Sequence, residues 1–206
     1  MRLALALLVA AVLLLAGCAG RPAAHLSATP AARTTTFTSK ELRFSVTFDA
    51  SKIVSPGLVF NPGDWDFAQV SFQDKDPKDH PFPASLGDSS GPPGGPSGCL
   101  VVVVWRQPSE NQAPSSTDLH DMLATSFAAH VMSNQKGVAA TTAVPVVYNG
   151  LPGYRSALSW KSGDSVTYIL YKKPLIYELE LTVAEAAQPS SRDALMAAMR
   201  SFEVTQ

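Results

Sequence analysis

An unbroken run of seven apolar residues, Cys99–Trp105, limits the folds that this 206-residue chain can adopt. Four of these residues are consecutive valines, and β-branched side chains favour strands. A strand without polar positions is buried on both faces, so other elements must cover it from two sides. We therefore expect a sheet that carries this strand at its centre.

The other apolar segments alternate with polar residues, which is the pattern of strands that are buried on one face. Turn sequences such as Asn149-Gly150 separate the strands of the second half, and short links of this kind join antiparallel neighbours. The sequence therefore predicts an antiparallel sheet whose second half is a meander. The expected strands are residues 42–48, 67–72, 99–105, 144–148, 154–160, 166–171 and 175–183.

Two further segments have apolar residues at helical spacing. The first is residues 116–133, and the second is residues 191–201; each begins at a pair of serines that can serve as the N-cap. With the antiparallel sheet, they predict an α+β fold in which a β-sheet is flanked by two principal helices. The apolar positions are Leu119, Met122, Leu123, Phe127 and Val131 in the first helix and Leu195, Met199 and Phe202 in the second.

A proline- and glycine-rich segment, Asp74–Gly98, interrupts this pattern with six prolines and five glycines in 25 residues. Neither a helix nor a central strand tolerates this density. The segment is predicted to be a long surface loop, and loops of this length are usually functional or disordered.

The N-terminus has the features of a bacterial lipoprotein precursor. Arg2 precedes an apolar run that is too short to span a membrane, as expected for a secretory signal peptide over residues 1–17. Leu15-Ala16-Gly17-Cys18 resembles the lipobox, in which the cysteine receives the lipid. We expect lipidated Cys18 and a flexible Ala/Pro-rich tether over residues 18–33, and a single domain over residues 34–206.

This N-terminus places the mature chain on the extracytoplasmic side of the cell membrane, held by the lipid on Cys18. The net charge is −1 for the whole chain and −2 without residues 1–17, which favours neither nucleic acid nor anionic lipid as a partner. Cys99 is the only other cysteine, so no disulfide within the mature chain is expected. Because it begins an apolar strand, we interpret it as a buried apolar residue rather than a reactive thiol.

The sequence contains no recognisable catalytic, metal or cofactor motif. There is no G-x-S-x-G, and the neighbours His120 and Asp121 are expected to point to different helix faces and not to pair. The acidic segment Asp74–His80 lacks the glycine and glutamate of an EF-hand loop. We therefore expect no enzymatic activity, no bound metal and no cofactor.

Two groups of residues are candidates for binding. Phe127, Tyr154, Trp160 and Tyr168 either pack in the core or line a pocket for a small apolar ligand. In the last strand Glu178 and Glu180 occupy the polar face, opposite the apolar face of Leu175 to Val183. The polar sheet face of Arg155, Ser159, Glu178 and Glu180 is either solvated or a surface that docks a partner.

The order of elements resembles the PsbP-like superfamily, and in particular the LpqN-type actinobacterial lipoproteins. The residues that carry this resemblance are the opening segment Phe37–Val46, the Gly-Leu-Pro-Gly-Tyr-Arg hairpin entry at residues 150–155 and the terminal Met199–Phe202. The resemblance implies an α-β-α sandwich that serves as an accessory or protein-binding module and has no shared catalytic residues.

The expected function is therefore that of a lipid-anchored, non-enzymatic accessory protein that binds another protein of the cell envelope through its sheet face or its long loop. The alternative is a carrier or sensor of a small apolar, lipid-like ligand, held between the sheet and the first helix near Phe127 and Tyr168.

Overall fold

The chain divides into two units, residues 1–31 and 32–206, and every residue described below belongs to the second. In the computed structural model, the described residues are 33–54, 58–59, 67–75, 98–106, 113–124, 139–161, 163–185, 187 and 189–206. The expected signal peptide, Cys18 and most of the tether lie outside these ranges, and so do residues 76–97 of the Pro/Gly-rich segment. Within the described ranges, no helix is long and apolar enough to cross a membrane.

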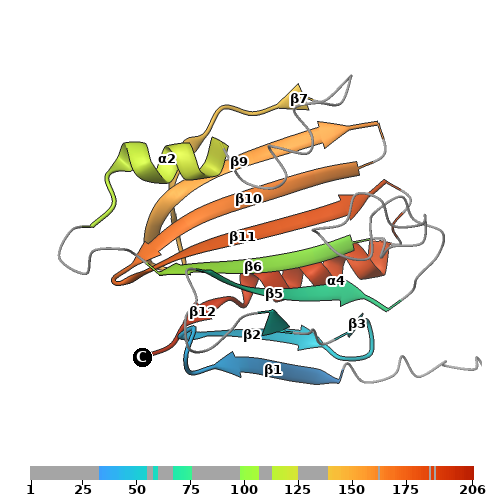
Figure 1. The fold of residues 1–206 in the computed structure, drawn as a ribbon. Helices are drawn as coiled ribbons and strands as arrows, with labels where there is room; N and C mark the ends of the chain where they lie inside the picture. The colour runs from blue at the N-terminus through green and yellow to red at the C-terminus, as the bar shows by residue number, and fades with distance from the viewer. Residues whose placement is uncertain are drawn as a thin grey trace, which may run out of the picture. The chain divides into compact units, whose positions relative to one another are not determined.

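The larger of two sheets in the described part of the chain has nine strands: β3 (Ile53–Val54), β4 (Leu58–Val59), β5 (Phe67–Asp74), β6 (Gly98–Arg106), β7 (Ala139–Ala140), β8 (Val144–Tyr148), β9 (Leu151–Trp160), β10 (Gly163–Lys172) and β11 (Leu175–Ala184). They follow the order β3-β5-β6-β11-β10-β9-β7, with antiparallel pairing throughout (Figure 1). β4 also pairs with β5, and β8 pairs with β9.

The strand predicted from the apolar run is present as β6, which lies between β5 and β11 in the interior of the sheet. Leu100, Val102 and Val104 on one face are completely buried, and Val101 on the other face is also buried. The prediction of a strand covered from two sides is therefore confirmed for this part of β6.

The predicted meander is also present, because β8, β9, β10 and β11 pair in chain order. Asn149 and Gly150 form the turn between β8 and β9 with φ angles of 49° and 80°. Two consecutive positive φ values are typical of the tight hairpin turn that an Asn-Gly pair favours.

A smaller sheet has the order β1-β2-β12, with β1 (Thr34–Ser39), β2 (Phe44–Asp49) and β12 (Glu203–Val204). The strand expected over residues 42–48 begins two residues later, because Leu42 and Arg43 belong to the turn between β1 and β2. Arg43 has a φ of 54°, and the Tyr177 hydroxyl of the larger sheet donates to the Leu42 carbonyl at 3.1 Å. The two sheets are thereby joined through this turn.

Helix α4 (Pro189–Arg200) packs on β2, β5, β6 and β11. It begins two residues before the predicted helix, with Pro189 at its first position, where a missing N–H costs no hydrogen bond. Leu195 of α4 is completely buried, and Phe202, which follows the helix, packs against the rings of Phe44 and Tyr177. The main hydrophobic core therefore lies between the larger sheet, α4 and the smaller sheet.

Helix α2 (Ser116–Ala124) lies against β9 and β10 on the other side of the larger sheet (Figure 1). Ser115 is its N-cap, since the Ser115 hydroxyl accepts the Asp118 N–H at 3.1 Å. Leu119 and Leu123 of α2 are buried with Ile169 in a second, smaller core. The remainder of the predicted helix, beyond Ala124 and including Phe127, lies outside the described residues.

The pairing register decides which side chains share a face. Glu178 pairs with Ile169, and Ile169 pairs with Tyr154, so all three lie on the α2 face of the sheet. Tyr168 pairs with Arg155 and therefore lies with it on the opposite, α4 face. The α+β sandwich expected from the sequence is broadly present, although strands dominate it and the described helices are few.

Candidate functional site

An open groove of about 600 Å³ lies on the α4 face, between α4 and strands β9 and β10. We call it the α4–β9 groove. Helix α4 packs mainly on β2, β5, β6 and β11, so the groove forms where the sheet extends past the helix. Its lining residues are Ala139, Thr141, Arg155, Ala157, Leu158, Ser159, Asp164, Ser165, Val166, Arg192, Asp193, Met196 and Arg200.

Three arginines and two aspartates line this groove. The Arg192 guanidinium donates to the Asp164 carboxylate, so its charge is already compensated. Arg155 lies over the ring of Tyr168, with Cζ 5.8 Å from the ring centroid. Among the described residues, neither Arg155 nor Arg200 has a carboxylate partner. The groove thus contains two guanidinium groups that are available to an anion.

Contacts between two tyrosines place Arg155 and Arg200 at the same end of the groove. The Tyr168 ring under Arg155 lies 4.6 Å from the ring of Tyr148. The Tyr148 hydroxyl donates to the Met199 carbonyl at 2.7 Å, directly before Arg200. Burial and, after it, the neighbouring Tyr168 raise the pKa of Tyr148 to about 12, and the positive charge of Arg200 opposes the increase. Tyr148 is therefore a neutral donor that holds the end of α4 over the sheet.

The turn between β8 and β9 strengthens this end of the groove. The Asn149 side-chain amide donates to the Phe202 carbonyl at 2.7 Å and to the Arg200 carbonyl at 3.2 Å. Carbonyls at the end of a helix have no partner within the helix, so these bonds satisfy them. The Asn-Gly pair expected only to form a turn therefore also fixes the position of Arg200.

The other end of the groove has a different composition. Ser159 pairs with Asp164 at this end, and Arg155 pairs with Tyr168 four residues further along β9. Four residues of a strand correspond to about 13 Å. Between the two ends, Ala157, Val166 and Met196 provide an apolar floor. The groove is therefore about 13 Å long between its two ends, has an apolar floor, and carries at one end positive charge that no described carboxylate compensates.

The predicted polar face of Arg155, Ser159, Glu178 and Glu180 is wrong as a single surface. Arg155 and Ser159 line the α4–β9 groove, whereas Glu178 and Glu180 lie on the α2 face. The glutamates are also only 5% and 4% exposed, so they do not form a solvated strand face. The alternation of side chains within each strand is as predicted. Which residues of neighbouring strands share a face, however, depends on the pairing register, and the sequence of one strand does not contain it.

These two glutamates belong to a buried polar layer on the α2 face. Burial and, after it, the neighbouring Glu180 raise the pKa of Glu178 to about 7, and the Trp105 indole opposes the increase. The Thr182 hydroxyl lies 3.2 Å from a carboxylate oxygen of Glu180 and 3.1 Å from the hydroxyl of Ser165. The layer brings carboxylates and hydroxyls together in the protein interior. A proton on Glu178 removes the charge of its carboxylate and so lowers the free-energy cost of burying this side chain.

The same pairing register places the residues of the predicted ligand pocket on two different faces of the sheet. Tyr154 and Trp160 lie on the α2 face, and Tyr168 lies on the α4 face beneath Arg155. Tyr154 packs against the smaller core of Leu119 and Leu123, and Phe127 is not among the described residues. These three aromatic residues therefore cannot line one pocket.

Cys99 lies on the α2 face near Glu180. Burial, with a further contribution from the carboxylate of Glu180, raises the pKa of Cys99 to about 12. At neutral pH the residue is a thiol and not the nucleophilic thiolate. This agrees with the interpretation of Cys99 as an unreactive thiol, although the residue is partly and not fully buried.

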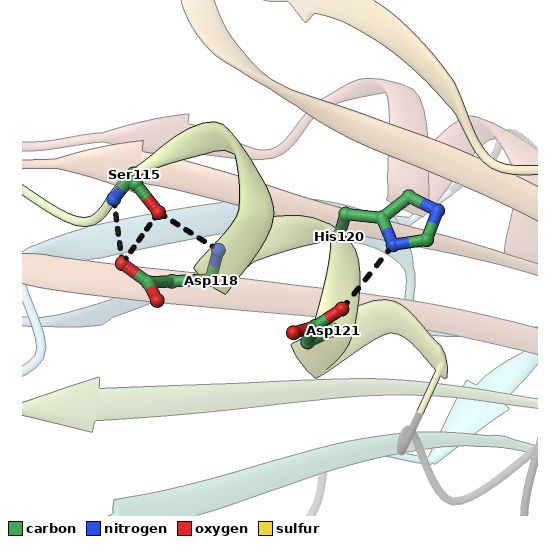
Figure 2. A network of polar contacts seen from close by, with 4 residues as sticks. All are labelled: Ser115, Asp118, His120 and Asp121. Carbon is green, nitrogen blue, oxygen red and sulfur yellow. Dashed lines mark hydrogen bonds and ion pairs between the residues drawn. The ribbon is translucent and has the colours of Figure 1, made fainter.

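The expectation that His120 and Asp121 cannot pair is wrong. Figure 2 shows the His120 ring nitrogen Nδ1 directed toward the Asp121 carboxylate, and the two atoms are 3.4 Å apart. Both side chains are at the surface, with exposed fractions of 48% and 70%, so they can lean toward each other beyond the helix backbone. Such an exposed and long contact contributes little to stability or to orientation of the ring. Within the described ranges, no three potential metal-binding side chains of the His, Cys, Asp and Glu types converge.

No protein-family model and no curated protein sequence matches this chain. Among solved structures, the cyanobacterial PsbP protein CyanoP from Synechocystis sp. PCC 6803 is similar over 89% of this chain and 99% of its own, with a TM-score of 0.51 and 14% identity. The fold is PsbP-like. A protein from Bacteroides thetaiotaomicron matches with a TM-score of 0.40, 12% identity and coverages of 83% of this chain and 48% of its own. A protein of unknown function from Pseudomonas aeruginosa matches with a TM-score of 0.38, 15% identity and coverages of 84% and 97%.

Proposed function

We propose that this chain is a lipid-anchored, non-enzymatic accessory module of the bacterial cell envelope, of the LpqN type, and that it binds a partner protein through the α4–β9 groove. The observation that carries the proposal is the groove itself, an open surface feature with an apolar floor and two arginines that have no carboxylate partner among the described residues. The anchoring part of the proposal rests on the lipobox at residues 15–18 and on the apolar run before it.

The side chains of the groove favour recognition over catalysis. Arginine remains protonated at physiological pH and cannot act as a general base. Of the two carboxylates that line the groove, Asp164 is engaged by Arg192 and Asp193 is exposed to solvent on α4, and the floor residues are apolar. Charged hydrogen bonds around an apolar centre are instead the composition of a protein-binding surface. The PsbP-like fold supports this interpretation at the level of architecture only.

The experiment that tests the proposal is site-specific cross-linking in cells. A photoreactive amino acid at Ser159, inside the groove, is expected to form a discrete adduct with an envelope protein. The same group at Lys52, which is exposed in a turn before β3, serves as the matched control. If both positions give the same adducts, or if the groove position gives none, the groove is not the docking surface.

A further inference from the structure

We propose that the α4–β9 groove recognises an extended polypeptide segment that carries acidic side chains, with a carboxylate of the partner bound between Arg155 and Arg200. This inference rests on the proposed function, because it specifies the chemistry of the partner in the same groove.

The placement of charge separates two of the arginines from the third. Arg192 already has Asp164 as its partner, so an incoming anion would have to compete for it. Arg155 faces the ring of Tyr168, and Arg200 stands at the end of α4 next to Tyr148. A carboxylate at this end would form charge-assisted hydrogen bonds that no side chain of the described ranges provides.

The shape of the groove favours an extended segment. The distance between the two ends, about 13 Å along β9, corresponds to about four residues of an extended chain. Ala157 and Val166 on the sheet and Met196 on the helix form a floor that can cover alternate apolar side chains. A segment in which acidic and apolar residues alternate therefore matches both the cationic end and the floor.

The backbone that carries Arg200 and the side chain of Arg155 are held in place before any partner binds. The Asn149 amide and the Tyr148 hydroxyl fix the end of α4, and the Tyr168 ring supports Arg155. A site whose charged groups are already positioned loses less conformational entropy on binding. The tyrosines and the turn are therefore positioning residues for the anion site.

The probe for this inference is a fluorescent peptide in which three glutamates alternate with valines, and fluorescence anisotropy measures its binding to the full chain. Arg155→Gln and Arg200→Gln are each expected to weaken binding by about tenfold, the usual effect of losing a charge-assisted hydrogen bond. Arg192→Gln should have a smaller effect, because Asp164 already compensates its charge. Lys172→Gln, which removes one exposed positive charge outside the groove, is the matched control.

Three results would overturn the inference. The first is equal binding of a peptide with glutamine in place of glutamate, since the carboxylates would then be irrelevant. The second is equal loss in all four variants, which would indicate attraction by net charge alone. The third is binding to vesicles with anionic lipid in preference to the peptide, which would identify a headgroup as the ligand.

The outcome also distinguishes this inference from the proposed function. If the peptide does not bind but the groove position still forms its discrete adduct in cells, the partner is not acidic and the docking function stands. If the adduct is also absent, both fail.

Discussion

The buried Glu178 predicts a specific dependence of stability on pH. Its carboxyl has a pKa of about 7 in the folded chain, against 4.5 for the unperturbed group, because burial and Glu180 disfavour its charge. The folded state therefore binds a proton that the unfolded state releases between these two values. The resulting contribution to stability is fully present below about pH 4.5 and is lost as the pH rises through 7.

The size of this effect follows from the change in pKa. The shift from 4.5 to about 7 corresponds to about 3 kcal/mol of unfolding free energy between the two limits. Between pH 5 and pH 8 the wild-type chain should lose about 2 kcal/mol through this group. Glu178→Gln replaces the carboxyl with an uncharged amide of the same shape and should remove this loss.

Urea unfolding at pH 5, 6, 7 and 8, followed by circular dichroism, measures the difference directly. For a typical denaturant slope of about 2 kcal/mol per molar, the urea midpoint of the wild type should fall between pH 5 and pH 8 by about 1 M more than the midpoint of Glu178→Gln falls. Glu185→Gln, at an exposed position just after β11, should behave as the wild type does. Parallel pH profiles of the wild type and Glu178→Gln would refute the argument that a protonated Glu178 is part of the fold.

Three further predictions concern the backbone, the end of α4 and the anchor. Gly153→Ala should destabilise the chain by about 3 kcal/mol in thermal unfolding, because a Cβ at this position would lie 2.0 Å from the Ile169 carbonyl oxygen. Gly150→Ala, with open space around it, should cost only about 1 kcal/mol for its positive φ. Equal costs of the two substitutions would contradict the close contact at Gly153. Asn149→Ala should cost about 1 to 2 kcal/mol, because the Phe202 and Arg200 carbonyls lose their donor and because alanine tolerates the positive φ of this position less well than asparagine. The lost donor should also increase amide exchange at the end of α4; unchanged exchange would show that water replaces it fully. Cys18→Ser should abolish incorporation of labelled palmitate and move the chain from the membrane fraction to the supernatant, whereas retention in the membrane would disprove lipid anchoring through this residue.

The sequence was sufficient for most elements of the fold because periodicity and turn chemistry are local properties. The apolar run at residues 99–105 predicted the interior strand β6, and Asn149-Gly150 predicted the hairpin of β8 and β9. Strand β12 was not predicted, since only its pairing with β2 makes residues 203–204 a strand. Such a short edge strand has no periodicity of its own.

The candidate site was predicted only in part, for a physical reason. Arg155 and Ser159 were correctly grouped because they share a strand, and both line the α4–β9 groove. Their grouping with Glu178 and Glu180 failed because a register between strands is set by pairing partners and not by either strand alone. Arg192 and Arg200 reach the groove from a helix at the end of the chain. No local pattern shows that this helix ends beside β8 and the turn that follows it.

The most direct test of the groove as a docking surface is labelling of its arginines with phenylglyoxal in native membranes and in the purified chain, read out by mass spectrometry. We predict that modification of Arg155 and Arg200 decreases in membranes, where the partner is present, and that modification of Arg43, in the turn between β1 and β2, does not change. Equal modification of the groove arginines in both preparations would contradict the account.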